Sequence, residues 1–263
     1  MAILTLECWS RHRVEYLSVL LASLHNQTFQ DWDIVILEEA DCNYLANPVF
    51  VGLLKRLKNQ GHRVVFLHPR EMLGNVRAAV TVMKETKTKY AMKLDDDHLF
   101  EMDALEKLVN VLEENEDIGA VGGMLHPITE ELIPRSEIPP DFNRWTGPKK
   151  RTWNDYTTLV YSFPEQIVEV DFVRAPFMYR ADKLRETNWI DLYPTLGYSD
   201  MAHRIESEIC NTLKKEFGYR IVIHTGVRMW HYLAPTGGCR MIDPRTREHD
   251  DEIYYSRWKE FHE

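Results

Sequence analysis

Three consecutive carboxylates, Asp95, Asp96 and Asp97, directly follow the largely apolar segment 90–94. Because side chains alternate along an extended strand, we expect Asp95 and Asp97 to point one way and Asp96 the other. Two such carboxylates can share one hard divalent cation with a substrate phosphate, as Mg²⁺ and Mn²⁺ sites commonly do. A solvated acidic turn is the alternative for an isolated triplet. The choice between the two depends on the elements that position the triplet.

Those elements alternate between strand and helix over the first half of the chain. The apolar patterns predict strands at residues 2–6, 33–37, 63–67, 89–94 and 118–121, with helices at 14–24, 48–60, 75–86 and 103–115. Repeated units of this kind predict an α/β fold with a Rossmann-like, mainly parallel sheet, helices on both faces, and ligands at the carboxyl ends of the strands. The aspartate triplet and a second acidic cluster, the pair Glu38 and Glu39, both lie at such ends, which favours a binding site.

The second half of the chain is less regular. Its proline-rich segment predicts a long loop over residues 126–155. The patterns then predict a smaller sheet and a late helix, with strands at 168–173, 177–179, 219–223 and 227–230, a helix at 207–217, a loop at 234–252 and a short helix at 253–262. No linker divides the chain, so we interpret residues 1–263 as one domain with parts 1–123, 124–233 and 234–263.

Composition excludes several classes of protein. The net charge of −9 argues against a nucleic-acid surface, which needs an excess of Lys and Arg. The longest apolar runs fall far short of the ~20 residues of a membrane span, and charged residues interrupt any signal peptide near the start. The four cysteines lack paired spacing, so they are expected to be free thiols. We therefore expect a cytoplasmic protein with no integral membrane segment.

Several segments, in order, resemble family 2 glycosyltransferases of the GT-A fold. Residues 15–39 resemble the first β-α-β unit of that family, residues 73–77 its glycine- and arginine-bearing turn, residues 94–98 its DXD segment, and residues 113–123 the stretch that follows. The resemblance is close over about residues 1–123 and looser through about 231. It implies a metal-dependent, inverting transferase that moves a sugar from a nucleotide-diphospho-sugar, with a UDP-sugar favoured, to a hydroxyl of a glycan, lipid-linked or protein acceptor.

The resemblance also implies a metal site that uses Mn²⁺ or Mg²⁺. It makes Asp97 the direct metal ligand and puts Asp95 nearer the ribose or a metal-bound water, with Asp96 beside them on the donor side. His231 lies where the family expects a late histidine to complete the coordination sphere, and His224 is the rival. Such a cation would neutralise the charge that builds on the departing diphosphate.

Recognition of the nucleotide is expected at the ends of the first two strands. The resemblance matches Glu39 to a family carboxylate that accepts from a uracil-type imide, with Glu38 as its neighbour, although the family usually has Asp there. Thr5 and Glu7 would line the other side of the base, in a segment that departs from the usual family turn. Arg77 would contact the base or the diphosphate, or else lie on the surface of its helix.

An inverting enzyme also needs a carboxylate base that takes the proton of the acceptor hydroxyl. The family supplies it from an acidic pair before a helix that ends in Gly-Tyr-(Arg/Lys)-Ile, and residues 205–221 occupy that place here with a spacing one residue longer. Glu206 and Glu208 are the candidates, with Glu206 favoured and Asp200 third. The one that is not the base would be an ordinary acidic residue of the first helical turn.

Two other functions fit parts of the pattern. A sugar-phosphate nucleotidyltransferase would share the sheet and the metal carboxylates, but it should carry a glycine-rich basic loop after the first strand, and residues 7–11 contain no glycine. A non-catalytic nucleotide-sugar-binding protein would have a degenerate site, whereas Asp95, Asp97 and His231 are present. Assembly as a homo-oligomer is left open by the sequence.

Overall fold

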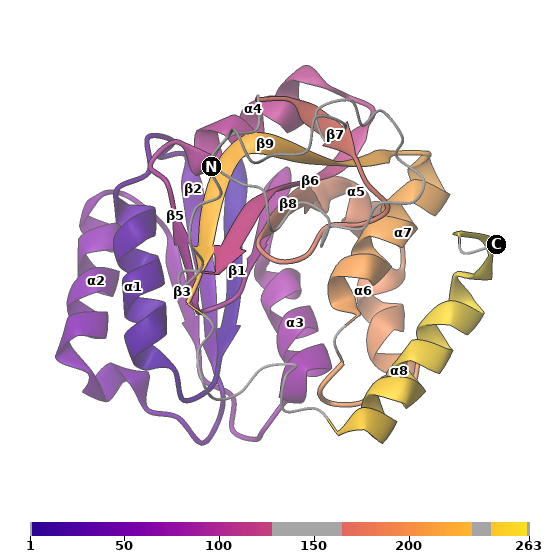
Figure 1. The fold of residues 1–263 in the computed structure, drawn as a ribbon. Coiled ribbons are helices and arrows are strands. Elements are labelled where there is room, and N and C mark those ends of the chain that lie inside the picture. The colour runs from indigo at the N-terminus through magenta and orange to yellow at the C-terminus, as the bar shows by residue number, and fades with distance from the viewer. Residues whose placement is uncertain (1, 128–164, 203, 233–242, 262–263) are drawn as a thin grey trace.

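The computed structural model describes residues 2–127, 165–202, 204–232 and 243–261. Its centre is a mixed nine-stranded sheet with the order β3-β2-β1-β4-β8-β6-β9-β5, and β7 pairs with β9 (Figure 1). The four parallel strands at one end are β3 (Val64–Leu67), β2 (Trp32–Glu38), β1 (Leu4–Ser10) and β4 (Tyr90–Leu94). This half confirms the predicted Rossmann-like, mainly parallel arrangement.

Helices cover both faces of the parallel strands. The helices α1 (Val14–His25) and α2 (Pro48–Asn59) lie on one side in Figure 1, and α3 (Gly74–Glu85) lies on the other. Val35 and Leu37 of β2 pack with Ala78 and Val82 of α3, whereas the alternating isoleucines of β2 join the larger core that includes the buried leucines of α1. The sheet is therefore buried on both faces, as an α/β fold requires.

Mostly antiparallel strands that follow β4 in the chain extend this sheet. They are β5 (His98–Phe100), β6 (Ile118–Pro127), β7 (Ile167–Glu169), β8 (Phe177–Arg180) and β9 (Arg220–His231). β8 pairs antiparallel with β4 and β6, β6 runs parallel to β9, and β5 and β7 pair antiparallel with β9. The expected strand at 168–173 is thus shorter, and those at 219–223 and 227–230 are one strand whose pairing with β6 shifts register between Gly122 and Met124.

Five more α-helices lie among the described residues after β5: α4 (Ala104–Glu114), α5 (Ala181–Glu186), α6 (Trp189–Leu192), α7 (Ile205–Phe217) and α8 (Pro244–Arg257). Short 3₁₀ helices lie at Tyr44–Ala46, Tyr193–Thr195 and Lys259–Phe261. The late helix predicted at 207–217 is confirmed as α7, and it ends at Gly218, whose φ of +70° is the left-handed conformation that glycine adopts freely.

Two further sequence predictions of local structure were wrong. The first strand runs to Ser10 because Glu7, which suggested its end, is a buried residue within it. Much of the loop expected at 234–252 is α8, where Asp243 caps the helix by accepting from the amide of Arg245 and Pro244 opens the first turn. Most of the predicted loop 126–155 lies outside the described residues. Among those that are described, no helix is long and apolar enough to cross a membrane.

Candidate functional site

The three aspartates lie in the turn between β4 and β5, and basic side chains neutralise all of them. Lys93 Nζ lies 2.6 Å from Asp95 Oδ1, and Arg13 Nη1 lies 2.9 Å from Asp96 Oδ1 and 3.5 Å from Asp97 Oδ2. Asp96 and Asp97 thus share one guanidinium, so the expected alternation of the triplet was wrong. The reason is that the strand ends at Leu94 and the triplet no longer has extended geometry.

Asp96 is fixed entirely by protein groups. Its second oxygen accepts a 2.6 Å hydrogen bond from the hydroxyl of Ser10, at the end of β1. Burial is the main reason why the pKa of Asp96 is raised to about 6, although Arg13 and Ser10 oppose the change. Asp96 therefore anchors the end of β1 and the start of α1 to the turn that carries Asp97.

Asp97 and His231 meet as the sequence predicted. Because β5 pairs antiparallel with β9, His231 lies directly opposite His98, and its Nε2 is 3.2 Å from Asp97 Oδ2. Burial opposes ionisation of Asp97, but the hydrogen bond and charge of His231 outweigh it and hold the pKa of Asp97 below its usual value. One potential ligand atom each from Asp97, His98 and His231 lies within 4.8 Å of the others, so these residues fit a divalent cation.

His224 does not share this place. It lies seven residues before His231 on the same strand, which corresponds to about 23 Å at ~3.3 Å per residue. Its Nδ1 accepts a 3.0 Å hydrogen bond from the amide of Gly226, and burial lowers its pKa. The structure therefore separates His224 from the aspartates.

Glu206 is joined to the aspartates through Lys93. It lies in the first turn of α7, and its carboxylate is 2.7 Å from Lys93 Nζ, the same ammonium that binds Asp95. The Lys93 side chain is almost completely buried, and its ammonium lies 5.1 Å from the centre of the Trp9 ring. Burial disfavours the charge on Lys93, but the two carboxylates outweigh it and raise its pKa. One buried cation thus holds two carboxylates that the sequence assigned to different roles.

Glu208 has different surroundings, two residues further along α7. It is fully buried, and its oxygens accept hydrogen bonds from Trp189 (3.1 Å), Tyr198 (2.7 Å), Arg257 (3.2 Å) and Trp258 (2.8 Å). Each oxygen accepts two of these bonds, so Glu208 has no oxygen left to take a proton from a substrate. The geometry gives Glu208 a structural role, because it ties α7 to α6 and to the C-terminal helix α8.

Asp200, the third candidate base, is exposed beside the start of α3. Its backbone carbonyl accepts from the amide of Asn75 at 2.5 Å, and a Cβ on Gly74 would lie only 2.8 Å from Asp200 Cβ. The side chain of Asn75 in turn accepts from Trp9 Nε1 and donates to the carbonyl of Ala202. Close packing therefore fixes the backbone of Asp200 against α3 and leaves its carboxylate toward solvent.

The acidic pair Glu38–Glu39 lies at the end of β2, as predicted. Glu38 accepts from the amide of Tyr44 at 2.6 Å and is 2.8 Å from Nδ1 of His68. Glu39 accepts a 2.9 Å hydrogen bond from the amide of Leu73, in the turn that leads to α3. Both carboxylates are buried at the strand end, where they also order the neighbouring loops.

Arg77 contacts its own turn. Its guanidinium donates to the carbonyls of Leu73 (3.0 Å) and Met72 (2.8 Å), and it lies 3.4 Å from Glu71. These contacts match the alternative in which Arg77 lies on the helix surface and closes the turn before α3.

Thr5 and Glu7 point into the protein, away from the end of β1. Thr5 bonds to the hydroxyl of Thr88 at 2.8 Å, while Glu7 accepts from Thr86 at 2.5 Å and from Tyr179 at 2.8 Å. Burial raises the pKa of Glu7 to about 7. Their expected place beside a nucleotide base is therefore corrected, since the strand that carries them ends at Ser10.

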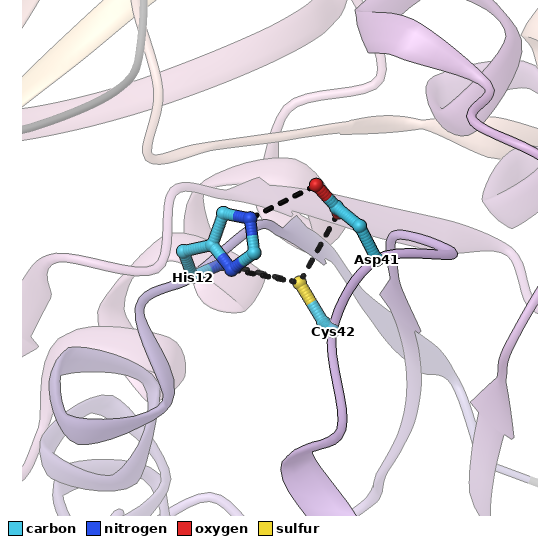
Figure 2. Close-up of side chains that lie close together, drawn as sticks. All are labelled: His12, Asp41 and Cys42. Atoms are coloured by element: carbon cyan, nitrogen blue, oxygen red, sulfur yellow. Dashed lines mark hydrogen bonds and ion pairs between the residues drawn. The ribbon is translucent and has the colours of Figure 1, made fainter.

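A second cluster of potential ligands lies in the loops that follow β1 and β2. Figure 2 shows His12, Asp41 and Cys42 facing one another, with His12 Nε2 2.9 Å from Asp41 and His12 Nδ1 3.7 Å from the sulfur of Cys42. Arg11 binds the same carboxylate at 2.7 Å, and its hydrogen bond is the main reason that the pKa of Asp41 falls to about 2. Burial raises the pKa of the Cys42 thiol. These contacts join the loop after β1 to the loop after β2, and Arg11 balances the charge of Asp41.

Four site residues were missed from the sequence: Ser10, Arg13, Lys93 and His98. Lys93 was the most visible of them, because a charge within the buried strand 90–94 calls for a partner. Arg13 and Ser10 carried no such signal, since their importance depends on where β1 ends.

Comparison with known proteins agrees with this architecture. A family model described as Glycosyl transferase family 2 matches residues 10–187, which is more than half of the chain. The fold is that of GT-A glycosyltransferases. The chain belongs to glycosyl transferase family 2.

Individual relatives are distant. An uncharacterized glycosyltransferase of Haemophilus influenzae is 22% identical over 117 residues, which cover 44% of this chain and 35% of that protein. S. aureus TarS 1-349 in complex with UDP-GlcNAc superimposes with a TM-score of 0.60 at 13% identity, over 96% of this chain and 64% of that one. The mannosyltransferase PcManGT from Pyrobaculum calidifontis, in complex with GDP-Man and Mn²⁺, superimposes with a TM-score of 0.58 at 12% identity, over 89% of this chain and 58% of that one. The chain thus spans only part of each relative.

Proposed function

We propose that the protein is a metal-dependent, inverting glycosyltransferase that moves a sugar from a UDP-linked donor to a hydroxyl of a glycan, lipid-linked or protein acceptor. One observation carries the proposal: a carboxylate–histidine group suited to a cation, Asp97 with His231, lies at the carboxyl edge of the sheet, and Lys93 links its neighbour Asp95 to Glu206. This arrangement unites a leaving-group site and a base in a family 2 fold.

Asp97 and His231 would hold the cation, with Asp95 nearer the ribose or a metal-bound water. When bound, the cation would stabilise the negative charge of the departing diphosphate. Asp97 has the ionised carboxylate that this role needs, and Asp95 is 42% exposed and therefore accessible to a donor. Arg13 Nη1 lies 3.5 Å from Asp97 Oδ2, a distance at which a hydrogen bond is weak. A cation that binds Asp97 would therefore displace little from Arg13.

Glu206 would take the proton of the acceptor hydroxyl. Its side chain is 15% exposed, so it is reachable from one side while Lys93 fixes the other. Lys93 does not contact the reacting atoms in this scheme and acts as a positioning residue. The observation that favours Glu206 over Glu208 is the complete burial of Glu208 among four donors.

The nucleotide would bind across the ends of β1 and β2. Glu39 is kept as the carboxylate that reads the base, with Glu38 holding the loop at Tyr44. Ser10, the last residue of β1, and Arg11, which follows it, replace Thr5 and Glu7 on the other side. TarS and PcManGT were solved with UDP-GlcNAc and with GDP-Man and Mn²⁺, which supports a nucleotide-sugar donor. A cytoplasmic location and a homo-oligomer stay predictions.

A donor panel tests the proposal. UDP-, GDP-, dTDP- and CMP-sugars are incubated with the protein and Mn²⁺, and release of nucleotide and free sugar is measured with and without chelator. We expect release from a UDP-sugar that stops when chelator is added and in Asp97→Ala. Release should continue in the control Asp103→Ala, whose carboxylate pairs with Lys107. Release that survives both chelator and Asp97→Ala, or neither binding nor release with any donor, would overturn the proposal.

A further inference from the structure

His98 is a fully buried imidazole, and neither of its ring nitrogens has a hydrogen-bond partner in the described part of the chain. Buried polar atoms are normally satisfied, so each exception calls for an explanation. His62 provides the contrast in the same molecule. It is also buried, but its Nδ1 lies 2.7 Å from the carbonyl of Trp32 and its Nε2 3.0 Å from Gln30.

The surroundings of His98 show what could satisfy it. Its ring centre is 4.8 Å from that of His231, the residue directly opposite on β9, and directly opposed side chains lie on the same face of a sheet. His231 Nε2 in turn lies 3.2 Å from Asp97 Oδ2, and one ligand atom from each of the three residues falls within 4.8 Å of the others. The unsatisfied imidazole therefore lies among the residues that would hold the cation.

We propose that His98 is a third protein ligand of that cation, together with Asp97 and His231. The inference rests on the proposed function, because it concerns the same metal site. Two imidazole nitrogens and one carboxylate form a donor set that suits Zn²⁺ and Co²⁺ best and Mn²⁺ more weakly, whereas Mg²⁺ prefers oxygen ligands and retains its water. His98 thus makes the site selective against Mg²⁺, a property that Asp97 and Asp95 alone would not confer.

The first test separates a ligand from a structural histidine. Metal binding and thermal unfolding are measured by calorimetry for wild type, His98→Leu and the matched control His62→Leu, with and without UDP. Replacing an unsatisfied buried imidazole by an apolar side chain of similar size should leave the metal-free melting temperature unchanged or higher. Mn²⁺ affinity should fall by more than ~10-fold, the lower end of the cost of losing an outer-shell partner. His62→Leu should lower the melting temperature and keep the Mn²⁺ affinity.

A second measurement is decisive in the wild-type protein alone, and His98→Leu adds a comparison where that variant folds. Electron-spin-echo modulation of bound Mn²⁺ counts the coordinated nitrogens, and we expect two in wild type and one in His98→Leu. Wild type should also prefer Mn²⁺ to Mg²⁺ by a larger factor than His98→Leu does.

One coordinated nitrogen in wild type, no Mn²⁺ binding with or without UDP, or a lower melting temperature with unchanged Mn²⁺ affinity in His98→Leu would overturn the role of His98. Failure of the proposed function is a separate result: Mn²⁺ held by two imidazoles in a protein that neither binds nor hydrolyses any donor of the panel.

Discussion

Lys93 is the residue whose removal should do most damage, because one buried ammonium separates two carboxylates. Lys93→Met keeps the approximate volume and removes the charge, which leaves Asp95 and Glu206 facing each other without a cation. Removing one partner of a buried ion pair typically costs ~3–5 kcal/mol. Asp95 is 42% exposed and is partly solvated by water, so we expect about 2–3 kcal/mol. At ~2–4 °C per kcal/mol for a domain of this size, the melting temperature should fall by roughly 4–12 °C.

The same change should reduce sugar transfer by more than the stability loss explains. Without the ammonium, Glu206 is no longer held 2.7 Å from a fixed point, and Asp95 loses its contact at 2.6 Å. Misplacement of a reacting group by about 1 Å can cost ~10²-fold in rate. Thermal unfolding followed by circular dichroism, and steady-state transfer measured well below the melting temperature, separate the two effects.

Lys107→Met is the matched control. Lys107 also bridges two carboxylates, Asp103 at 3.0 Å and Glu165 at 3.2 Å, but all three side chains are at least 25% exposed. Exposed pairs contribute ~0–1 kcal/mol, so this variant should keep wild-type activity and lose little stability. A Lys93→Met protein with the stability and transfer rate of wild type would refute the reasoning, as would equal losses in both variants.

The remaining predictions use other residues. Glu206→Gln should lower turnover by ~10²–10⁴-fold with donor binding kept, as loss of a general base does, and this is measured by transfer kinetics and UDP calorimetry. Glu208→Gln should instead lower stability by about 2–3 kcal/mol in urea unfolding, since Glu208 is fully buried and Arg257, which is 26% exposed, loses its charge partner. A loss of turnover in Glu208→Gln with a loss of stability in Glu206→Gln would exchange their roles. His231→Ala should weaken Mn²⁺-dependent UDP binding at neutral pH, and unchanged binding would return His231 to a structural role. Burial raises the pKa of Glu7 from 4.5 to about 7, so the folded state holds this proton more tightly, and stability present below pH 4.5 should be lost as pH rises through 7, by roughly 3 kcal/mol. Urea unfolding between pH 5 and 8 should show a slope that Glu7→Gln reduces, while Asp96, whose pKa is also raised, contributes the rest; equal slopes in wild type and Glu7→Gln would contradict this.

The parallel half of the fold was predictable because its signals are local. Apolar runs such as 33–37 and 89–94 marked strands, and Gly61 marked the end of the helix at 48–60. What the sequence could not show was that Glu7 is buried within the first strand. The first strand was predicted to end before Glu7, because a carboxylate is rarely buried. The hydroxyls of Thr86 and Tyr179, which donate hydrogen bonds to Glu7 in the core, come from distant parts of the chain.

The candidate site, too, was predictable where the signal was local and not where it depended on distant residues. The acidic triplet and His231 were found from residue type and order, and the structure brings Asp97 and His231 to 3.2 Å. The roles of Glu206 and Glu208 could not be separated, because the burial of Glu208 depends on α8, and that helix lies in a segment predicted to be mostly loop. His98 was overlooked because its importance comes from the strand pairing that puts it opposite His231.

The most direct test of the central claim is the position of Mn²⁺ and nucleotide in crystals grown with Mn²⁺ and UDP, located by anomalous scattering. We predict one strong Mn²⁺ peak within about 2.5 Å of Asp97 and His231, with the diphosphate on the metal and the base at the end of β2 beside Glu39. A peak at the His12–Asp41–Cys42 cluster instead, or UDP bound away from the carboxyl ends of β1, β2 and β4, would contradict the claim.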